Sequence, residues 1–260
     1  MGNKFCILIV SVFLLKGCTT TPTGRTQLKL MPSNRLAEMG NQSFNQMKEN
    51  KSLSQNKLYQ KRTRCITDRL LIAIGKNPKE WKVQVFQDET PNAFALPGGN
   101  MGVHTGMIEL VKNNDQLAAV MGHEIGHVLA DHGNERVSQG LVTQVGLTSA
   151  QLALGMDSTK DQFIFAALGL GAQFGVLMPF SRHQESEADS LGLKYMALAG
   201  FDPREASELW RLMGKGKSVS KLEEFLSTHP SPDSRVKELS ASAPSYLTSY
   251  NANRNKEPCP

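Results

Sequence analysis

The sequence predicts an α+β fold that is mainly α-helical, with a small antiparallel sheet in its N-terminal half. Residues 82–86 alternate polar and apolar side chains, which is typical of a half-buried strand. Two further strand-like runs, 92–96 and 101–105, flank a Gly-rich turn at 97–100. Helical patterns cover most of the remaining chain. With 260 residues, 40% of them hydrophobic, the chain is long enough for one domain with a substantial core.

The helices follow from capping residues and from breaks in the pattern. Residues 33–76 are mostly helical in pattern and end at Asn77-Pro78. A helix over 115–131 has capping groups just before it and Gly133 just past its end. Further helices are expected at 139–155, at 162–180, at 181–200, after Asp202-Pro203 and after Ser231-Pro232. The most apolar of these, 162–180, holds three glycines, so we expect a packed or membrane-facing helix rather than a transmembrane one.

The first 17 residues have the pattern of a signal peptide. Lys4 precedes an apolar run that is too short to span a bilayer and remain there. The sequence Leu15-Lys16-Gly17-Cys18 then resembles the bacterial lipoprotein cleavage box, in which Cys18 is the lipidated residue. Residues 18–32 are expected to be a linker. An ordinary secretory signal that happens to precede a cysteine is the alternative interpretation.

The charge of the chain gives no indication of nucleic-acid binding. The net charge is +5, and removal of residues 1–17 lowers it to +3 because Lys4 and Lys16 leave with the signal. The remaining basic residues are scattered, without the basic and aromatic cluster that a nucleic-acid surface requires.

Two cysteines, Cys65 and Cys259, lie far apart in the mature chain. A pair of cysteines in an exported protein often forms a disulfide, which we expect here. Two free thiols are the alternative. Metal ligation by this pair is not expected, because the cysteines lack C-x-x-C spacing.

A possible metal site is indicated by His123-Glu124-Ile125-Gly126-His127, which has the pattern H-E-x-x-H inside the predicted helix 115–131. Residues four apart lie on one face of a helix, so both imidazoles can bind one metal ion. Glu124 is then placed to act as a general base on a water at that ion. A catalytic zinc site needs a third protein ligand, which must come from another segment.

The third ligand is expected in the segment 181–189. A third histidine six residues after His127, as metzincins have, is excluded because position 133 is glycine. Glu185 and Asp189 are four residues apart on a predicted helix, so one carboxylate can bind the metal while the other accepts a hydrogen bond from a ligand imidazole. Glu187, which lies off that face, is the alternative ligand.

These segments together resemble the HtpX-like family of zinc metallopeptidases, in particular its periplasmic BepA- and LoiP-type lipoprotein proteases. The resemblance rests on H-E-I-G-H-V-L-A-D-H-G followed by P-F-S-R-x-x-E-x-E-A-D-x-x-G, and it covers roughly residues 80–240. It implies a zincin-like (gluzincin) domain over 33–243 that binds one Zn²⁺ per chain. The implied zinc ligands are His123, His127 and Glu185, with Glu124 as the base and Asp189 outside the ligand shell.

Two further segments match the same family. Asn92, Ala93 and Phe94 begin a segment that resembles the strand beside the family's cleft, and an edge strand of this kind can pair with an extended peptide. The run 228–235 resembles the family's T-H-P-x-x-x-x-R segment, which implies that His229 lies near the zinc. His229 is then either a donor to the oxyanion or a plug in the open coordination position; both remain open.

The function expected from these features is a zinc-dependent endopeptidase of the bacterial cell envelope that cleaves misfolded or misassembled proteins. The resemblance, with Thr19 after the lipidated Cys18, implies the periplasmic face of the outer membrane. The alternative is a latched protease that acts mainly as a chaperone or assembly factor, in contact with outer-membrane assembly machinery. Residues 244–260 are polar and are expected to form a loose tail.

Overall fold

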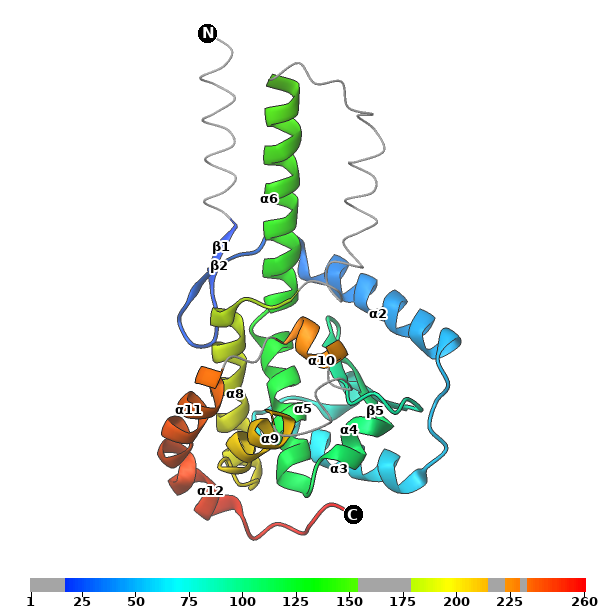
Figure 1. The fold of residues 1–260 in the computed structure, drawn as a ribbon, viewed down its shortest axis with the longest axis vertical. Coiled ribbons are helices and arrows are strands. Elements are labelled where there is room, and N and C mark those ends of the chain that lie inside the picture. The colour runs from blue at the N-terminus through cyan, green and yellow to red at the C-terminus, as the bar shows by residue number, and fades with distance from the viewer. Residues whose placement is uncertain (1–16, 154–178, 215–222, 230–232) are drawn as a thin grey trace.

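The computed structural model describes residues 17–153, 179–214, 223–229 and 233–260, which form a helical domain with two small sheets (Figure 1). Its strands are β1 (Cys18–Thr20), β2 (Thr26–Leu28), β3 (Lys82–Phe86), β4 (Ala93–Leu96) and β5 (Asn100–His104). The helices of the first half are α2 (Ser33–Asn50), α3 (Lys57–Ala73), η1 (Pro78–Glu80), α4 (Thr105–Leu110), α5 (Asn114–Leu129) and α6 (His132–Ala153). Those of the second half are α8 (Arg182–Ala199), α9 (Glu205–Gly214), α10 (Glu223–Thr228), α11 (Asp233–Ser242), η3 (Ala243–Tyr246) and α12 (Leu247–Asn253). The expected mainly helical architecture is confirmed.

Helix α5, which carries H-E-x-x-H, lies at the centre of the domain. Asn113 caps it by accepting a hydrogen bond from the backbone N–H of Gln116 at 2.8 Å. Every residue from Gln116 to His127 is buried, because the helix packs against α3, α8, α9 and strand β4. A helix that is enclosed on all sides holds its side chains in fixed rotamers, which suits a site that requires defined geometry.

The sheet beside α5 is mixed, whereas the sequence predicted an antiparallel one. Strands β4 and β5 form the expected antiparallel hairpin, and Gly98 and Gly99 make its turn with φ values of 84° and 75°. Strand β3, however, pairs with β5 in parallel, so the strand order is β3-β5-β4. An alternating pattern gives the faces of a strand but not its neighbour, which is why this pairing was not foreseen. The order leaves β4 at the edge next to α5.

The helix ends agree closely with the capping signals. Ser181 and Gln184 form a capping box at the start of α8, and Gly200 ends that helix with a φ of 79°. Helix α6 begins at His132, earlier than the expected 139, because the chain turns at Asp131 with a φ of 56° instead of passing through a loop. The expected helix at 162–180 lies outside the described residues except for its last two.

The expected linker at 18–32 is a folded part of the domain. Strands β1 and β2 form an antiparallel hairpin, and the segment that follows is bound to the start of α6. The backbone N–H of Leu30 donates to Ser138 Oγ at 2.8 Å, and Asn134 Nδ2 donates to the carbonyl of Met31 at 2.7 Å. We call residues 17–31 the N-terminal arm.

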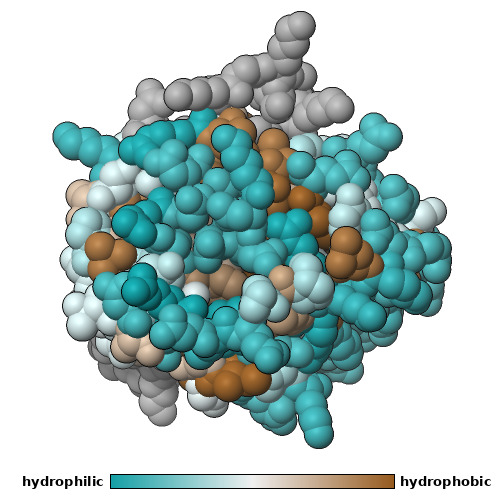
Figure 2. All heavy atoms as spheres, turned by 90° about the horizontal axis from the view of Figure 1, so that it is seen from below, coloured by the Kyte–Doolittle hydropathy of each residue, from teal (hydrophilic) through white to brown (hydrophobic). Residues whose placement is uncertain are grey.

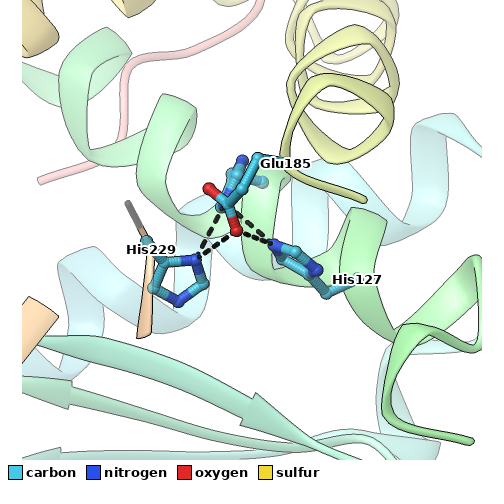
Figure 3. A group of neighbouring side chains, drawn as sticks. His127, Glu185 and His229 are labelled. Atoms are coloured by element: carbon cyan, nitrogen blue, oxygen red, sulfur yellow. Dashed lines mark hydrogen bonds and ion pairs between the residues drawn. The ribbon is translucent and has the colours of Figure 1, made fainter. Parts of the chain in front are cut away.

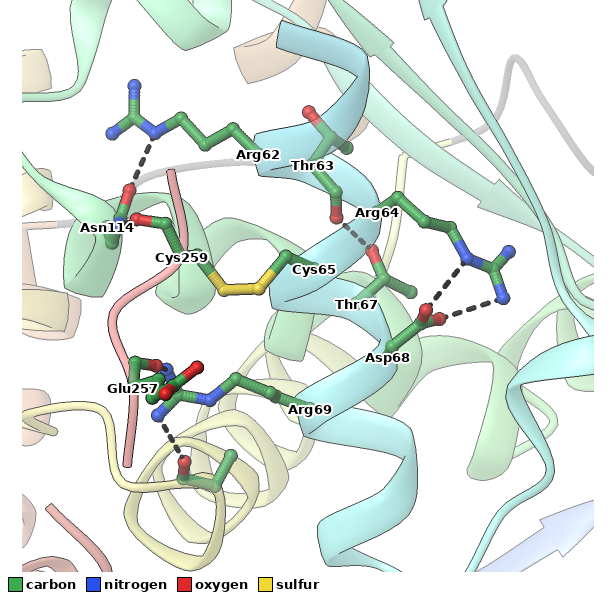
Figure 4. The surroundings of a disulfide bond; sticks show 11 residues. Arg62, Thr63, Arg64, Cys65, Thr67, Asp68, Arg69, Asn114, Glu257 and Cys259 are labelled. Carbon is green, nitrogen blue, oxygen red and sulfur yellow. Dashed lines mark hydrogen bonds and ion pairs between the residues drawn. A yellow bond between two sulfur atoms is a disulfide. The ribbon is translucent and has the colours of Figure 1, made fainter. Parts of the chain in front are cut away.

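The expected loose tail is likewise ordered over much of its length. Residues 243–253 form η3 and α12, and α12 packs against α8. Beyond them, Cys259 is joined to Cys65 of α3 by a disulfide (Figure 4). Asn114 Nδ2 also donates to the carbonyl of Cys259 at 2.8 Å, and Arg69 donates to the carbonyl of Glu257 at 3.1 Å. The C-terminal segment therefore packs against α3 and the start of α5.

Removal of this disulfide should lower the stability of the domain. The bond joins residues 194 positions apart, so it greatly restricts the unfolded chain. We expect the double variant Cys65→Ser, Cys259→Ser to lose about 2–5 kcal/mol of unfolding free energy, measured by urea denaturation. Reducing the unmodified protein should give the same loss, and a reductant should not affect the double variant. A reductant effect on the double variant would contradict this assignment.

Among the helices that the structure describes, none is long and apolar enough to cross a bilayer. Helix α6 projects beyond the body of the domain in Figure 1. Figure 2 shows the opposite end of the molecule, where the surface is mostly hydrophilic and apolar residues form small separate patches.

Candidate active site

His123 and His127 project from the same face of α5, as the i, i+4 spacing requires. Their Nε2 atoms lie 3.0 Å apart, and their rings meet edge to face with centroids 4.6 Å apart. Both side chains are buried. Burial lowers the pKa of His127, and the neighbouring His123 lowers it further, so this imidazole is neutral and its lone pair is available to a metal.

Helix α8 brings Glu185 to these histidines because α5 and α8 approach very closely. A Cβ on Gly126 would lie 3.1 Å from the carbonyl oxygen of Ala188, and one on Gly192 would lie 3.2 Å from the backbone nitrogen of His123. Both positions therefore favour glycine. The close contact places Glu185 Oε1 3.3 Å from His127 Nε2 (Figure 3).

A fourth donor comes from His229, directly after α10. Its Nδ1 lies 3.1 Å from Glu185 Oε1 and 3.3 Å from His123 Nε2, as Figure 3 illustrates for the labelled residues. Phe225 stacks on the His229 ring with centroids 4.7 Å apart and holds it in this position. The sequence placed His229 near the metal without fixing its role.

The four side chains form a group suited to a divalent transition metal. One ligand atom from each of His123, His127, Glu185 and His229 lies within 4.8 Å of the others, and all four residues are buried. Three imidazole nitrogens and one carboxylate oxygen are donors that zinc accepts. We call these four residues the metal-binding group. Glu187, the alternative ligand, is not part of it.

Glu124 lies beside the metal-binding group and outside it. Its Oε2 accepts a hydrogen bond from the backbone N–H of Ala95 at 3.1 Å, which fixes the carboxylate. Its Oε1 is buried, makes no hydrogen bond within the described residues and lies 3.4 Å from His229 Nε2. Burial raises the pKa of Glu124 although His229 and His123 partly oppose the shift. A carboxylate with a raised pKa and one uncommitted oxygen is suited to accept a proton.

Asp189 supports His123, as the sequence predicted for a residue outside the ligand shell. Asp189 Oδ1 lies 3.0 Å from His123 Nδ1, which leaves Nε2 to face the metal-binding group. No role was predicted for Arg235 of α11, which donates to Asp189 from Nε at 2.8 Å and from Nη2 at 2.6 Å and also bonds to Glu185. Burial raises the pKa of Asp189, but Arg235 and His123 outweigh this effect and hold the pKa below its usual value.

The predicted substrate strand is the edge strand β4. Asn92 lies just before it, where its carbonyl accepts a hydrogen bond from the backbone N–H of His104 at 2.9 Å. Hydrogen-bonded and non-bonded pairs alternate along antiparallel strands, so Ala93 and Ala95 direct their backbone groups away from β5. Ala95 uses its N–H for Glu124. The side chain of Phe94 instead packs in a small cluster with Phe44 and Phe86.

Two residues for which no role at the site was predicted contact the metal-binding group. Phe180 stacks on the ring of His127, with centroids 3.7 Å apart. His132 is fully buried, and its Nδ1 lies 2.9 Å from His127 Nδ1. His132 follows His127 by five residues, but a chain turn at Asp131 redirects it, so helical spacing alone does not reveal the contact.

A buried H-E-x-x-H helix, a carboxylate ligand on a neighbouring helix and an edge strand beside the glutamate together define a metallopeptidase-type domain. Comparison with known families agrees: the model described as "Peptidase family M48" matches residues 57–243. The chain belongs to peptidase family M48.

Several curated relatives share this region. The mitochondrial metalloendopeptidase OMA1 of Schizosaccharomyces pombe is 35% identical over 175 residues, which cover 67% of this chain and 50% of the relative. The β-barrel assembly-enhancing protease of Yersinia pestis is 29% identical over 209 residues (76% of this chain, 42% of the relative). Its Escherichia coli counterpart is 34% identical over 151 residues (56% and 31%). The chain thus spans half or less of the length of these relatives.

Proposed function

We propose that this protein is a zinc-dependent endopeptidase. The observation that carries the proposal is the position of Glu124, whose uncommitted oxygen lies beside a buried group of three histidines and one glutamate. A structural zinc site needs four ligands but has no use for a fifth side chain, here a carboxylate of raised pKa. When bound, zinc would polarise the scissile carbonyl and lower the pKa of a bound water towards about 7.

The protein's own residues would perform the proton transfers. Glu124 would take the proton of the attacking water on Oε1, while the Ala95 N–H keeps Oε2 in place. Glu124 would then deliver that proton to the leaving nitrogen of the cleaved peptide bond. His127 and His123 would hold the metal through Nε2, since the Nδ1 atoms face His132 and Asp189 respectively.

The substrates we propose are unfolded or misassembled proteins of the bacterial envelope. The carbonyl of Ala95, which faces away from β5 on a partly exposed stretch of the edge strand, can pair with an extended peptide, and such pairing depends little on side-chain sequence. Folded proteins seldom offer an unpaired extended segment to an edge strand. The likeness to a β-barrel assembly-enhancing protease supports substrates of this class, and the N-terminal sequence supports lipidation of Cys18 and a place at the periplasmic face of the outer membrane.

The first test is the zinc content of the full chain together with cleavage of an unfolded substrate such as casein. We expect one zinc per chain and casein cleavage that stops when a chelator removes the metal. Zinc can be measured by atomic absorption on the dialysed protein. A protein that binds no zinc, or that cleaves casein equally well after chelation, would overturn the proposal.

A second candidate, a latched protease that acts mainly in assembly of outer-membrane proteins, is favoured by the position of His229. Its Nδ1 lies among the donor atoms of the metal-binding group, so it would occupy the position that a catalytic zinc leaves to water. We expect His229→Ala to raise casein turnover several-fold and to retain zinc on the three other ligands. A fall in turnover would instead identify His229 as a donor to the oxyanion. Thr228→Ala is the matched control on the same segment.

A further inference from the structure

A second polar cluster contacts the metal-binding group at Nδ1 of His127. His132 Nδ1 is 2.9 Å from His127 Nδ1, and His132 Nε2 is 3.2 Å from Glu187 Oε2. His132 is fully buried and Glu187 nearly so. The metal-binding group itself does not use Glu187 or His132, so their arrangement requires a separate explanation.

The hydrogen bonds in this cluster have one consistent direction. His127 Nε2 faces Glu185 Oε1 at 3.3 Å, so it is the nitrogen that presents a lone pair to the metal-binding group. The proton of neutral His127 is then on Nδ1, which donates to His132 Nδ1. His132 must carry its own proton on Nε2, which donates to the carboxylate of Glu187. The chain from His127 to Glu187 therefore ends on a negative charge.

The N-terminal arm holds that carboxylate in place. Arg25 Nε donates to Glu187 Oε2 at 2.7 Å, and the hydroxyl of Thr23 donates to Glu187 Oε1. The two terminal nitrogens of Arg25 bind Glu135 of α6, each at 2.7 Å. A bidentate arginine fixes geometry better than a single ion pair, so the arm determines where the end of the chain lies.

We propose that Arg25 of the N-terminal arm is a functional part of the metal site, because through Glu187 and His132 it fixes the tautomer and the orientation of the ligand His127. His132 and Glu187 are positioning residues in this proposal, and they touch neither substrate nor metal. The proposal rests on the metal site of the proposed function. Hydrogen bonds to a ligand imidazole of this kind typically change metal affinity or activity 10- to 100-fold.

A purely structural role would be met more simply by apolar residues. Burying a histidine and a carboxylate is costly unless every polar atom is paired, and apolar side chains of similar volume commonly give equal or greater stability. In this cluster both ring nitrogens of His132 are paired, and one of them is paired with a proposed metal ligand. This pairing is what a positioning role requires.

The test measures zinc affinity of the full chain by competition with a chromophoric chelator. We expect His132→Phe, which keeps the volume and loses both hydrogen bonds, to weaken zinc binding 10- to 100-fold. His132→Asn, whose side-chain oxygen can still accept from His127, should recover part of the affinity. At saturating zinc, kcat should fall while KM stays the same. Thermal melting of the metal-free variants reports whether they fold.

Arg25→Ala and Lys29→Ala distinguish loss of the hydrogen bonds that run from Glu187 to His127 from a general loosening of the arm. Arg25 touches Glu187, whereas Lys29 binds the same arm to Asp131 and does not touch Glu187. We expect a several-fold weaker zinc affinity for Arg25→Ala and an unchanged one for Lys29→Ala. If His132→Phe does not fold, His132→Asn and Arg25→Ala still test the proposal.

The outcomes distinguish this inference from the proposed function. Wild-type protein that binds zinc and cleaves casein, together with unchanged zinc affinity in the His132 and Arg25 variants, would overturn the inference and leave the peptidase proposal standing. Equal losses in Arg25→Ala and Lys29→Ala would also overturn it, because they would indicate attachment alone. Wild-type protein without zinc affinity would overturn both.

Discussion

Glu124→Gln should lower casein turnover by roughly 10³-fold while the protein keeps its zinc. The amide is the same size as the carboxylate but has no basic oxygen, so the variant cannot accept the proton of the attacking water. Zinc should remain because Glu124 is not one of the four residues of the metal-binding group. A 10³-fold loss corresponds to about 4 kcal/mol of activation free energy. Single-turnover kinetics and zinc content, measured on the same preparation, check both parts.

The matched controls for this variant are Glu124→Asp and Glu109→Gln. Aspartate keeps the charge but withdraws the oxygens from the site, so we expect partial activity at most. Glu109 is an exposed carboxylate that accepts a hydrogen bond from Tyr59 OH at 3.2 Å and is not part of the metal-binding group, so its amide variant should be fully active. A Glu124→Gln protein that cleaves casein normally would exclude Glu124 as the base. Loss of zinc from it would show that Glu124 belongs to the ligand set.

The part of the site that was predictable from sequence depends on local spacing. The separations of His123 from His127 and of Glu185 from Asp189 are four residues, and a helix of fixed pitch converts this spacing into a shared face. Capping residues such as Asn113 and Ser181 likewise fixed helix ends to within a residue or so. These features depend on neighbours in the chain, and the sequence contains all of that information.

The parts that were missed depend on contacts between distant segments. Arg235 reaches Asp189 across 46 residues, and Arg25 reaches Glu187 across 162. Neither partner stands at a helical or strand spacing from the other. The polar composition of 18–32 and 244–260 predicted loose chain, yet a bidentate arginine holds the first segment on the domain, and the disulfide between Cys65 and Cys259, which the cysteine pair did predict, holds the second. A few specific bonds can order a segment whose composition gives no sign of it.

Arg235→Met should destabilise the metal-free protein by about 3–5 kcal/mol, since it removes the cation that Asp189 and Glu185 share. Arg235 is itself buried and lies over the ring of Trp210 at 3.9 Å, a contact that methionine can partly replace. The loss therefore comes chiefly from two buried carboxylates left without this partner. Urea denaturation of the metal-free protein measures it. Arg211→Met, which removes an exposed ion pair to Glu208, should cost less than about 1 kcal/mol.

The pH dependence of this loss identifies its cause. In the unmodified protein Arg235 and His123 hold the pKa of Asp189 below its usual value, so their stabilisation is present at neutral pH and is lost as the pH falls through that lowered pKa. In Arg235→Met, burial is no longer opposed by the arginine, and the pKa of Asp189 should rise. The variant can then relieve the buried charge by taking up a proton as the pH falls, so the stability difference between the two proteins should shrink in acid. A difference that stays constant between neutral and acidic pH would mean that lost packing on Trp210, rather than the unpaired carboxylates, is responsible.

Adding Asp189→Asn to Arg235→Met should separate the two causes further. The second substitution removes one of the two unpaired buried carboxylates, so it should recover part of the lost stability only if charge is the origin of that loss.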